Sequence, residues 1–131
     1  MARFVITPDV GLYLAEREQR IGDEHRLLAP TLFRSEALSL LYRAVRRGEL
    51  TKVEADRRLR YLRSLRMRLL GDRVLQEFAW KFAEELGLEE TLSAEYLALT
   101  RLQADALITL DPGLARAAER VVPTAPPEAL F

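Results

Sequence analysis

The stretch ALITLDPG at residues 106–113 joins a short apolar run to a sharp turn signal. The run Ala106–Leu110 has the length and character of a buried strand, and the following Asp-Pro-Gly is a strong turn sequence. The Ala-rich segment Leu114–Arg120 comes next and predicts a short helix. Because strands followed directly by helices are the building units of α/β proteins, this stretch indicates the fold class.

The same alternation of strand and helix appears near the N-terminus. Arg3–Thr7 is a β-branched and aromatic run that stops at a proline, and Leu12–Arg20 is typical of a short helix. His25–Ala29 predicts a second strand, and Val121–Val122 predicts a last edge strand. Strands separated by helices favour a parallel sheet that is covered on both faces. We therefore expect an α/β domain of three layers with a small central sheet.

Four longer helices are predicted between residues 31 and 103. Thr31 can cap the first, Thr51 with Glu54 forms a capping box for the second, and Asp72 can cap the third. The predicted ranges are about 31–47, 53–70, 72–86 and 91–103. The aromatic side chains of the third helix (Phe78, Trp80 and Phe82) are expected to pack in the core or in a dimer contact rather than to stack on bases.

Length and composition indicate one small domain. The 131 residues are 49% hydrophobic, which suits a single core. We expect the domain to span residues 1–122 and to be followed by a proline-rich, linker-like tail at residues 123–131. No segment is long and apolar enough to span a membrane or to form the core of a signal peptide, so we expect a cytoplasmic protein.

Several classes of site are excluded by residue counts. The chain has no cysteine, which excludes a disulfide scaffold and a thiolate metal site. It has one histidine, His25, which excludes a site built on paired histidines.

Charge is distributed unevenly although the net charge is zero. Residues 43–73 hold 11 basic and 4 acidic side chains, whereas residues 74–131 hold 4 basic and 10 acidic ones. A basic segment beside an acidic one is compatible with a nucleic-acid-binding protein that has a metal pocket. Two solvated helix faces of opposite sign would give the same pattern.

Acidic residues follow the predicted strands at the edge where α/β proteins place their sites. Asp9 comes soon after the first strand, Glu36 lies near the start of the helix that follows the second, and Asp111 ends the third. Carboxylates that converge at such an edge suit Mg²⁺ or Mn²⁺. Asp111 could instead serve only as a helix cap.

Four segments together resemble the PIN-domain family, of the kind found in bacterial VapC-type toxins. They are FVITPDV (residues 4–10), LAPTLFRSE (28–36), LSAEYLAL (92–99), and ALITLD with LARAA (106–111 and 114–118). The resemblance implies a PIN-like three-layer α/β/α domain with a small central parallel sheet. It also implies an acidic cluster that binds a divalent metal and cleaves RNA.

Carried over position by position, the family's acidic cluster falls here on Thr7, Glu36, Ser93 and Asp111. Two of these four are hydroxyls, and the chain between the first strand and Glu36 is short for the family. Asp9 could compensate, because in an extended chain it would point to the same side as Thr7. Glu95 and Ser93 are expected to point to nearly opposite sides of their helix. We thus expect Asp9, Glu36 and Asp111 to be the metal ligands and catalytic residues, and Thr7 and Ser93 to take part in binding the metal cofactor.

The function implied by the resemblance is a Mg²⁺- or Mn²⁺-dependent endoribonuclease of a toxin–antitoxin pair. RNA, an antitoxin-like protein and a second copy of the chain would be its partners. Arginines of the second long helix would contact RNA phosphates; they are Arg57, Arg58, Arg60 and Arg63. The alternatives are a catalytically impaired PIN fold that binds RNA or a protein, and a helical interaction protein unrelated to this family.

Overall fold

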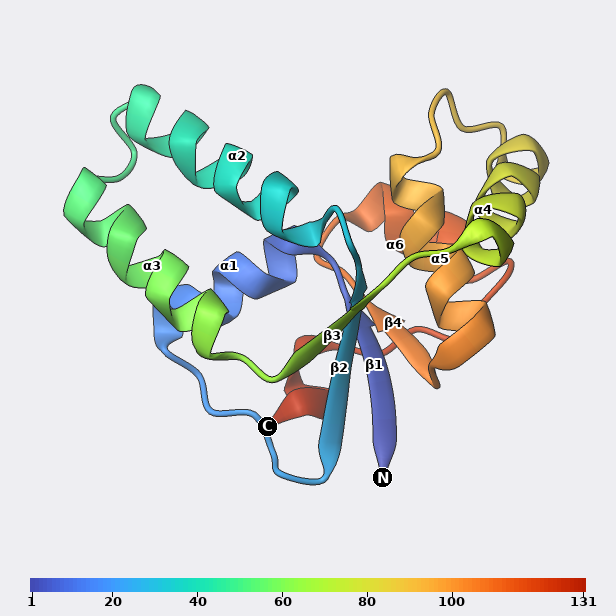
Figure 1. Cartoon of the computed structure of the whole chain (residues 1–131), viewed down its shortest axis with the longest axis horizontal. Coiled ribbons are helices and arrows are strands. Elements are labelled where there is room, and N and C mark those ends of the chain that lie inside the picture. The colour runs from blue at the N-terminus through green and yellow to red at the C-terminus, as the bar shows by residue number, and fades with distance from the viewer.

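The computed structural model of residues 1–131 is built on one parallel sheet of four strands (Figure 1). The strands are β1 (Ala2–Ile6), β2 (His25–Pro30), β3 (Met67–Leu70) and β4 (Ala106–Ile108). Their order across the sheet is β3-β2-β1-β4. The register pairs Phe4 with Leu27 on one side and with Ala106 on the other, so the apolar centres of the strands lie side by side.

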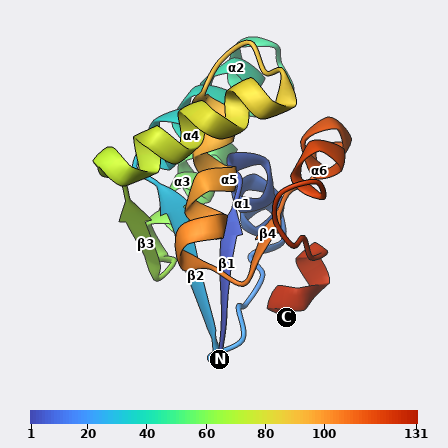
Figure 2. The ribbon, with the colours of Figure 1, turned by 90° about the vertical axis from the view of Figure 1, so that its right-hand side faces the viewer.

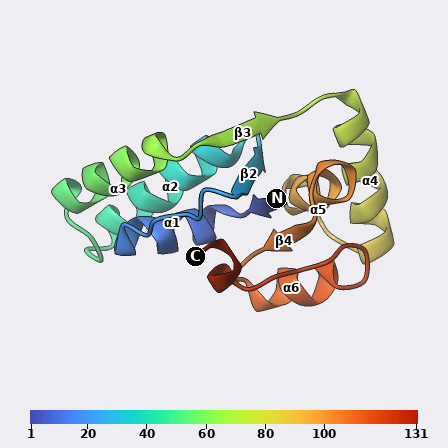
Figure 3. The ribbon, with the colours of Figure 1, turned by 90° about the horizontal axis from the view of Figure 1, so that it is seen from below.

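Helices cover both faces of the sheet, which confirms the three-layer α/β prediction (Figure 3). Three helices, α1 (Pro8–Arg17), α2 (Phe33–Arg46) and α3 (Lys52–Ser64), lie on one face. On the other lie α4 (Arg73–Leu86) and α5 (Leu92–Gln103), while α6 (Pro112–Ala118) lies beyond β4. No helix is both long and apolar enough to cross a lipid bilayer.

The core is continuous through the sheet because the central strands are apolar on both faces. Val5 and Ile6 of β1 and Leu107 of β4 have no solvent exposure. Near-continuous apolar runs of this kind are typical of parallel strands that are covered by helices on both sides. On the other side, α5 buries Ala94, Leu97 and Ala98 against the sheet, and its small residues allow a close approach.

Helix α1 meets α2 at a glycine. A Cβ atom at Gly11 would lie 2.8 Å from Cζ of Phe33, which is itself fully buried at the start of α2. The absence of a side chain therefore allows the first turns of the two helices to approach closely. This contact holds the start of α1 and the start of α2 at the same edge of the sheet.

Three helix boundaries follow the caps and stops expected from the sequence. Thr51 and Glu54 form the capping box at α3, with the Thr51 hydroxyl accepting from the Glu54 N–H at 3.1 Å. The Asp72 carboxylate accepts from the Leu75 N–H at the start of α4. Gly87 follows α4 with a φ of 68°, a conformation that glycine adopts at little cost.

Other boundaries differ from the prediction. The first helix begins at Pro8, not at Leu12, because proline is well suited to the first turn of a helix. Thr31 is not the cap of α2, which begins at Phe33 with Leu32 at the cap position. The second long helix was wrongly extended to Leu70, because α3 ends at Ser64 and residues 67–70 form the edge strand β3 beside β2.

The C-terminal segment also differs from the expected edge strand and linker-like tail. Val121–Val122 is not a strand, and the one bridge of this region joins Leu107 with Thr124. A short 3₁₀ helix (Pro127–Leu130) follows, and Leu130 is completely buried in the core. Residues 123–131 therefore pack as part of the domain.

The aromatic side chains of α4 are placed in two ways. Phe82 is buried and Phe78 partly buried, with their rings edge to face, as expected for core packing. Trp80 is 65% exposed, so it does not pack in the core, and the alternative of a dimer contact stays a prediction for this residue.

Candidate functional site

A pocket of about 530 Å³ opens at the carboxyl ends of β1 and β4, beside the start of α2, which follows β2. Its lining residues come from α2 on one side and from α5 and the start of α6 on the other, and Figure 1 shows these helices on either side of the strand ends. All five residues expected at the metal site line it: Thr7, Asp9, Glu36, Ser93 and Asp111. The fold therefore brings together side chains that are more than 100 residues apart in the sequence.

Asp9 reaches the pocket from the first turn of α1. The expected extended segment is wrong, because Pro8 opens the helix directly after Thr7. The buried Thr7 hydroxyl donates to Oδ1 of Asp9, and the Val10 N–H donates to the same oxygen at 2.8 Å. Thr7 thus orients Asp9 at the pocket.

Glu36 projects from the first turn of α2 and is held by Tyr96 of α5. The Tyr96 hydroxyl donates to Oε1 of Glu36 at 2.6 Å. Burial raises the pKa of Tyr96, and the hydrogen bond to Glu36 and its negative charge raise this pKa further. Tyr96 therefore stays a protonated donor throughout the ordinary pH range.

Asp111 caps α6 and also lies at the pocket, and its role as a metal ligand stays a prediction. Its Oδ1 caps α6, accepting from the Gly113 N–H at 2.9 Å, and the residue also lines the pocket. The Thr109 hydroxyl accepts from the Asp111 N–H and lies 3.1 Å from the Thr7 hydroxyl. A chain of polar contacts therefore links the end of β4 to the end of β1.

Ser93 lines the pocket from the first turn of α5 and does not cap the helix. Glu90 does so, since its carboxylate accepts from the N–H groups of Leu92 and Ser93. Glu95 is absent from the pocket lining, in keeping with the helical spacing, but it is electrostatically coupled to Glu36. Burial raises the pKa of Glu95, and the charges of Glu36 and Glu90 raise it further. Negative charge thus accumulates around this pocket.

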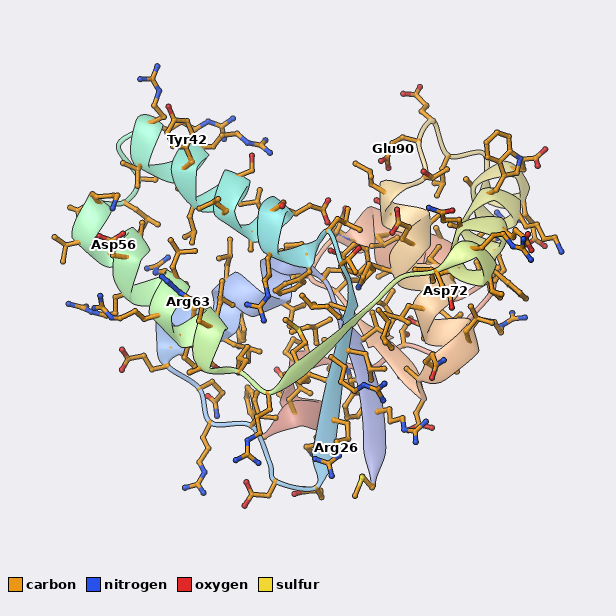
Figure 4. The ribbon with its side chains drawn as sticks, in the orientation of Figure 1. Arg26, Tyr42, Asp56, Arg63, Asp72 and Glu90 are labelled. Carbon is orange, nitrogen blue, oxygen red and sulfur yellow. The ribbon has the colours of Figure 1, made fainter.

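Arg43 of α2 is the one basic residue in the pocket lining. The four arginines expected to contact RNA lie on α3, as predicted. This helix packs beside α1 and α2, and none of the four arginines lines the pocket. Figure 4 shows Arg63 on α3, in the half of the molecule formed by α1–α3. The contact of α3 with RNA stays a prediction, and it would occur away from this pocket.

The metal-binding capacity of the pocket is limited by its number of close carboxylates. No group of three or more Asp, Glu or His side chains lies close enough to hold a metal ion together. Mg²⁺, however, commonly binds through one or two carboxylates and completes its shell with water and substrate phosphate. The donors present fit a cation bound in that partial way and not one enclosed by protein ligands.

Sequence reasoning missed Tyr96 and Arg43 as site residues. Tyr96 follows Ser93 by three positions on the same helix, so the helical repeat places both on one face. Arg43 follows Glu36 by seven positions, two turns further along α2. These spacings are the signals that could have indicated both residues.

Comparisons with known proteins establish the fold. No family model matches the chain, and no curated protein matches it. The crystal structure of PAE2754 from Pyrobaculum aerophilum is similar, with a TM-score of 0.74 and 22% sequence identity. The similarity covers 98% of this chain and 92% of that one.

Proposed function

We propose that this chain is a PIN-family domain that cleaves RNA with the help of Mg²⁺ or Mn²⁺, in the manner of VapC-type toxins. The proposal rests on the resemblance of the four sequence segments and on the position of the pocket. A pocket at the carboxyl ends of parallel strands is the usual location of a site in open α/β sheets.

One observation carries the proposal: each of the three pocket carboxylates has one oxygen held and one oxygen available. Oδ1 of Asp9, Oε1 of Glu36 and Oδ1 of Asp111 accept hydrogen bonds from protein donors. No protein donor reaches the second oxygen of these carboxylates. Donors that fix one carboxylate oxygen orient the other as a ligand, which is the usual arrangement around metal sites.

Each residue of the pocket would have a distinct role in cleavage. One or two of the carboxylates of Asp9, Glu36 and Asp111 would hold the cation directly, and water and substrate phosphate would complete its shell. The bound cation would supply an activated water molecule for attack on a phosphodiester. Tyr96 keeps Glu36 oriented, and Thr7 does the same for Asp9. Arg43 would bind a substrate phosphate at the side of the pocket formed by α2.

The resemblance also suggests partners and a compartment. An antitoxin-like protein and a second copy of this chain would bind the domain, which would act in the cytoplasm. Leu38 on α2 and Trp80 on α4 are large apolar side chains that are exposed in the single chain. Such residues are suited to protein contacts.

The test is RNA cleavage with Mg²⁺ or Mn²⁺ by the wild type and by a Glu36→Gln, Asp111→Asn variant. Glutamine still accepts from Tyr96 and asparagine still caps α6, so the fold is preserved while two charges are removed. Glu49→Gln with Asp23→Asn changes charge by the same amount at exposed positions outside the pocket. We expect cleavage by the wild type and this control, and none by the pocket variant. Equal cleavage by all three proteins would contradict the proposal.

A catalytically impaired PIN fold that binds RNA or a protein is the second candidate. It is favoured by the hydroxyls of Thr7 and Ser93, which stand where the family has acidic residues, and by the absence of a close group of three carboxylates. No cleavage by any of the three proteins, together with RNA binding by all, would support it.

A further inference from the structure

A row of arginines crosses the sheet at the end opposite to the pocket. Arg3 of β1 is in register with Arg26 of β2. The pairing of Leu27 with Met67 places Arg66 next to Arg26 in the same row, just before β3 begins. Arg68 lies two residues further along β3 and is in register with Leu28. Since alternate residues of a strand share a face and paired residues point the same way, all four arginines lie on one face of the sheet.

These four arginines line one surface pocket of about 320 Å³. Gln103, the last residue of α5, borders it, so the pocket lies on the α5 face of the sheet. All four side chains are exposed, whereas Leu28, on the same face of the sheet, is buried. Figure 2 shows β1 and β2 extending below α5, and Figure 4 shows Arg26 at this lower end of β2.

The charge of this arginine row is not compensated by the protein. No Asp or Glu side chain lies within ion-pair distance of any of the four guanidinium groups. Asp105, at the same end of the sheet, is bound through its Oδ2 to the backbone N–H of Arg3 at 2.7 Å. Like charges directly opposite on neighbouring strands destabilise a sheet. The row therefore carries four positive charges that no ion pair within the domain neutralises.

The chemistry of the row favours phosphate over an acidic protein surface. Guanidinium groups bind phosphate through paired hydrogen bonds, and a row of them suits a chain of phosphates. Protein interfaces depend on buried aromatic or large apolar anchors. Apart from Met1, none of the large exposed apolar side chains lines this pocket.

We propose that Arg3, Arg26, Arg66 and Arg68 form a binding site for the phosphate backbone of single-stranded nucleic acid, separate from the acidic pocket. Arg66 and Arg68 belong to the basic segment of residues 43–73. The structure places Arg68 on β3 and Arg66 just before it, so neither lies on α3. The inference does not depend on metal-dependent cleavage, because phosphate binding here involves none of the pocket carboxylates.

The experiment measures binding of a fluorescent, cleavage-resistant 2′-O-methyl oligouridine in EDTA at low salt. We compare the wild type with Arg26→Gln, Arg68→Gln and with the charge-matched control Arg116→Gln, Arg120→Gln, whose exposed positions lie in or just after α6. We expect the first variant to bind about tenfold more weakly. Its salt dependence should also fall by about 1.4 in the slope of log K against log salt, since two phosphate contacts are lost. The control should bind like the wild type.

Three results would overturn the inference. One is an equal loss of affinity in both variants, and another is equally tight binding of a polyglutamate peptide, which would indicate an acidic protein partner. The third is a lower thermal midpoint for Arg26→Gln, Arg68→Gln, because removing uncompensated repulsion should leave the midpoint unchanged or raise it. If only the cleavage proposal fails, the wild type should still bind oligouridine through the arginine row. The Glu36→Gln, Asp111→Asn variant should likewise bind oligouridine as tightly as the wild type.

Discussion

Tyr96 and Glu36 join the two helical layers across the carboxyl edge of the sheet. The Tyr96 hydroxyl on α5 lies 2.6 Å from Oε1 of Glu36 on α2, and these helices lie on opposite faces of the sheet. Tyr96 is almost fully buried, while Glu36 is partly exposed at the pocket. The hydrogen bond therefore couples the packing of α5 to the orientation of a proposed metal ligand.

Tyr96→Phe should lower the Mn²⁺ affinity of the pocket more than it lowers the stability of the fold. The phenyl ring keeps the packing, so only the hydrogen bond is lost, and we expect a loss of about 1 kcal/mol in the free energy of unfolding. Without its orienting donor, Glu36 should bind Mn²⁺ about tenfold more weakly. Urea unfolding and calorimetric titration with Mn²⁺ measure the two effects. The exposed Tyr42→Phe should change neither quantity, and unchanged Mn²⁺ affinity in Tyr96→Phe would show that the hydrogen bond does not orient a ligand.

Glu95→Gln should stabilise the protein at neutral pH and not at low pH. Burial, Glu36 and Glu90 raise the pKa of Glu95 above its ordinary value of 4.5, so its ionisation is more costly in the folded state. The destabilising contribution of ionised Glu95 is therefore lost as pH falls through its raised folded-state pKa and down to 4.5. Thermal unfolding should give a higher midpoint for Glu95→Gln than for the wild type at neutral pH, and this difference should disappear below pH 4.5. An advantage that is constant with pH would contradict the electrostatic explanation.

Leu130→Ala should destabilise the domain although it lies in the expected tail. Leu130 is fully buried, and its carbonyl accepts from the Gly22 N–H at 2.9 Å, which fixes the loop before β2. Removing a buried leucine side chain leaves a cavity and costs about 2–4 kcal/mol. Chemical denaturation measures the loss, and Phe131→Ala, at an exposed neighbour, is the control. Equal stability of the two variants would mean that residues 123–131 do not contribute to the core.

The strand–helix alternation was predictable because the central strands have strong local signals. β1, β2 and β4 are apolar runs that end at a proline or a turn, since both of their faces are buried. β3 was missed because it is a short edge strand, and no glycine or proline separates it from α3. The alternation of arginine with Met67 and Leu69 was the available signal, but the preceding helix obscured it.

The members of the candidate site were easier to predict than their geometry. Asp9, Glu36 and Asp111 follow strands of one parallel sheet, and topology alone brings such residues to one edge. The contact of Tyr96 with Glu36 depends on how α5 and α2 pack across the sheet, which no local pattern specifies. The arginine row was hidden for the same reason, because Arg3, Arg26 and Arg66 become neighbours only through strand register.

Ser93→Asp should strengthen metal binding, since it adds a carboxylate to the pocket at the position that the proposed resemblance to PIN domains assigns to an acidic residue. Ser93 lines the pocket from the first turn of α5, where a negative charge is also favoured by the helix dipole. Mn²⁺ affinity should increase by about tenfold or more, because a charged oxygen ligand replaces water. Without metal the variant should be less stable than the wild type, since the new charge lies near the Glu90 carboxylate, which accepts from the Ser93 N–H, and shares the pocket with Glu36. Calorimetry with Mn²⁺ and thermal unfolding with and without Mn²⁺ measure both effects, with the uncharged Ser93→Asn as the matched control. Equal Mn²⁺ affinities for Ser93→Asp and Ser93→Asn would mean that the pocket does not hold a cation at this edge, and the carboxylates of Asp9, Glu36 and Asp111 would then serve only to cap and orient the helices.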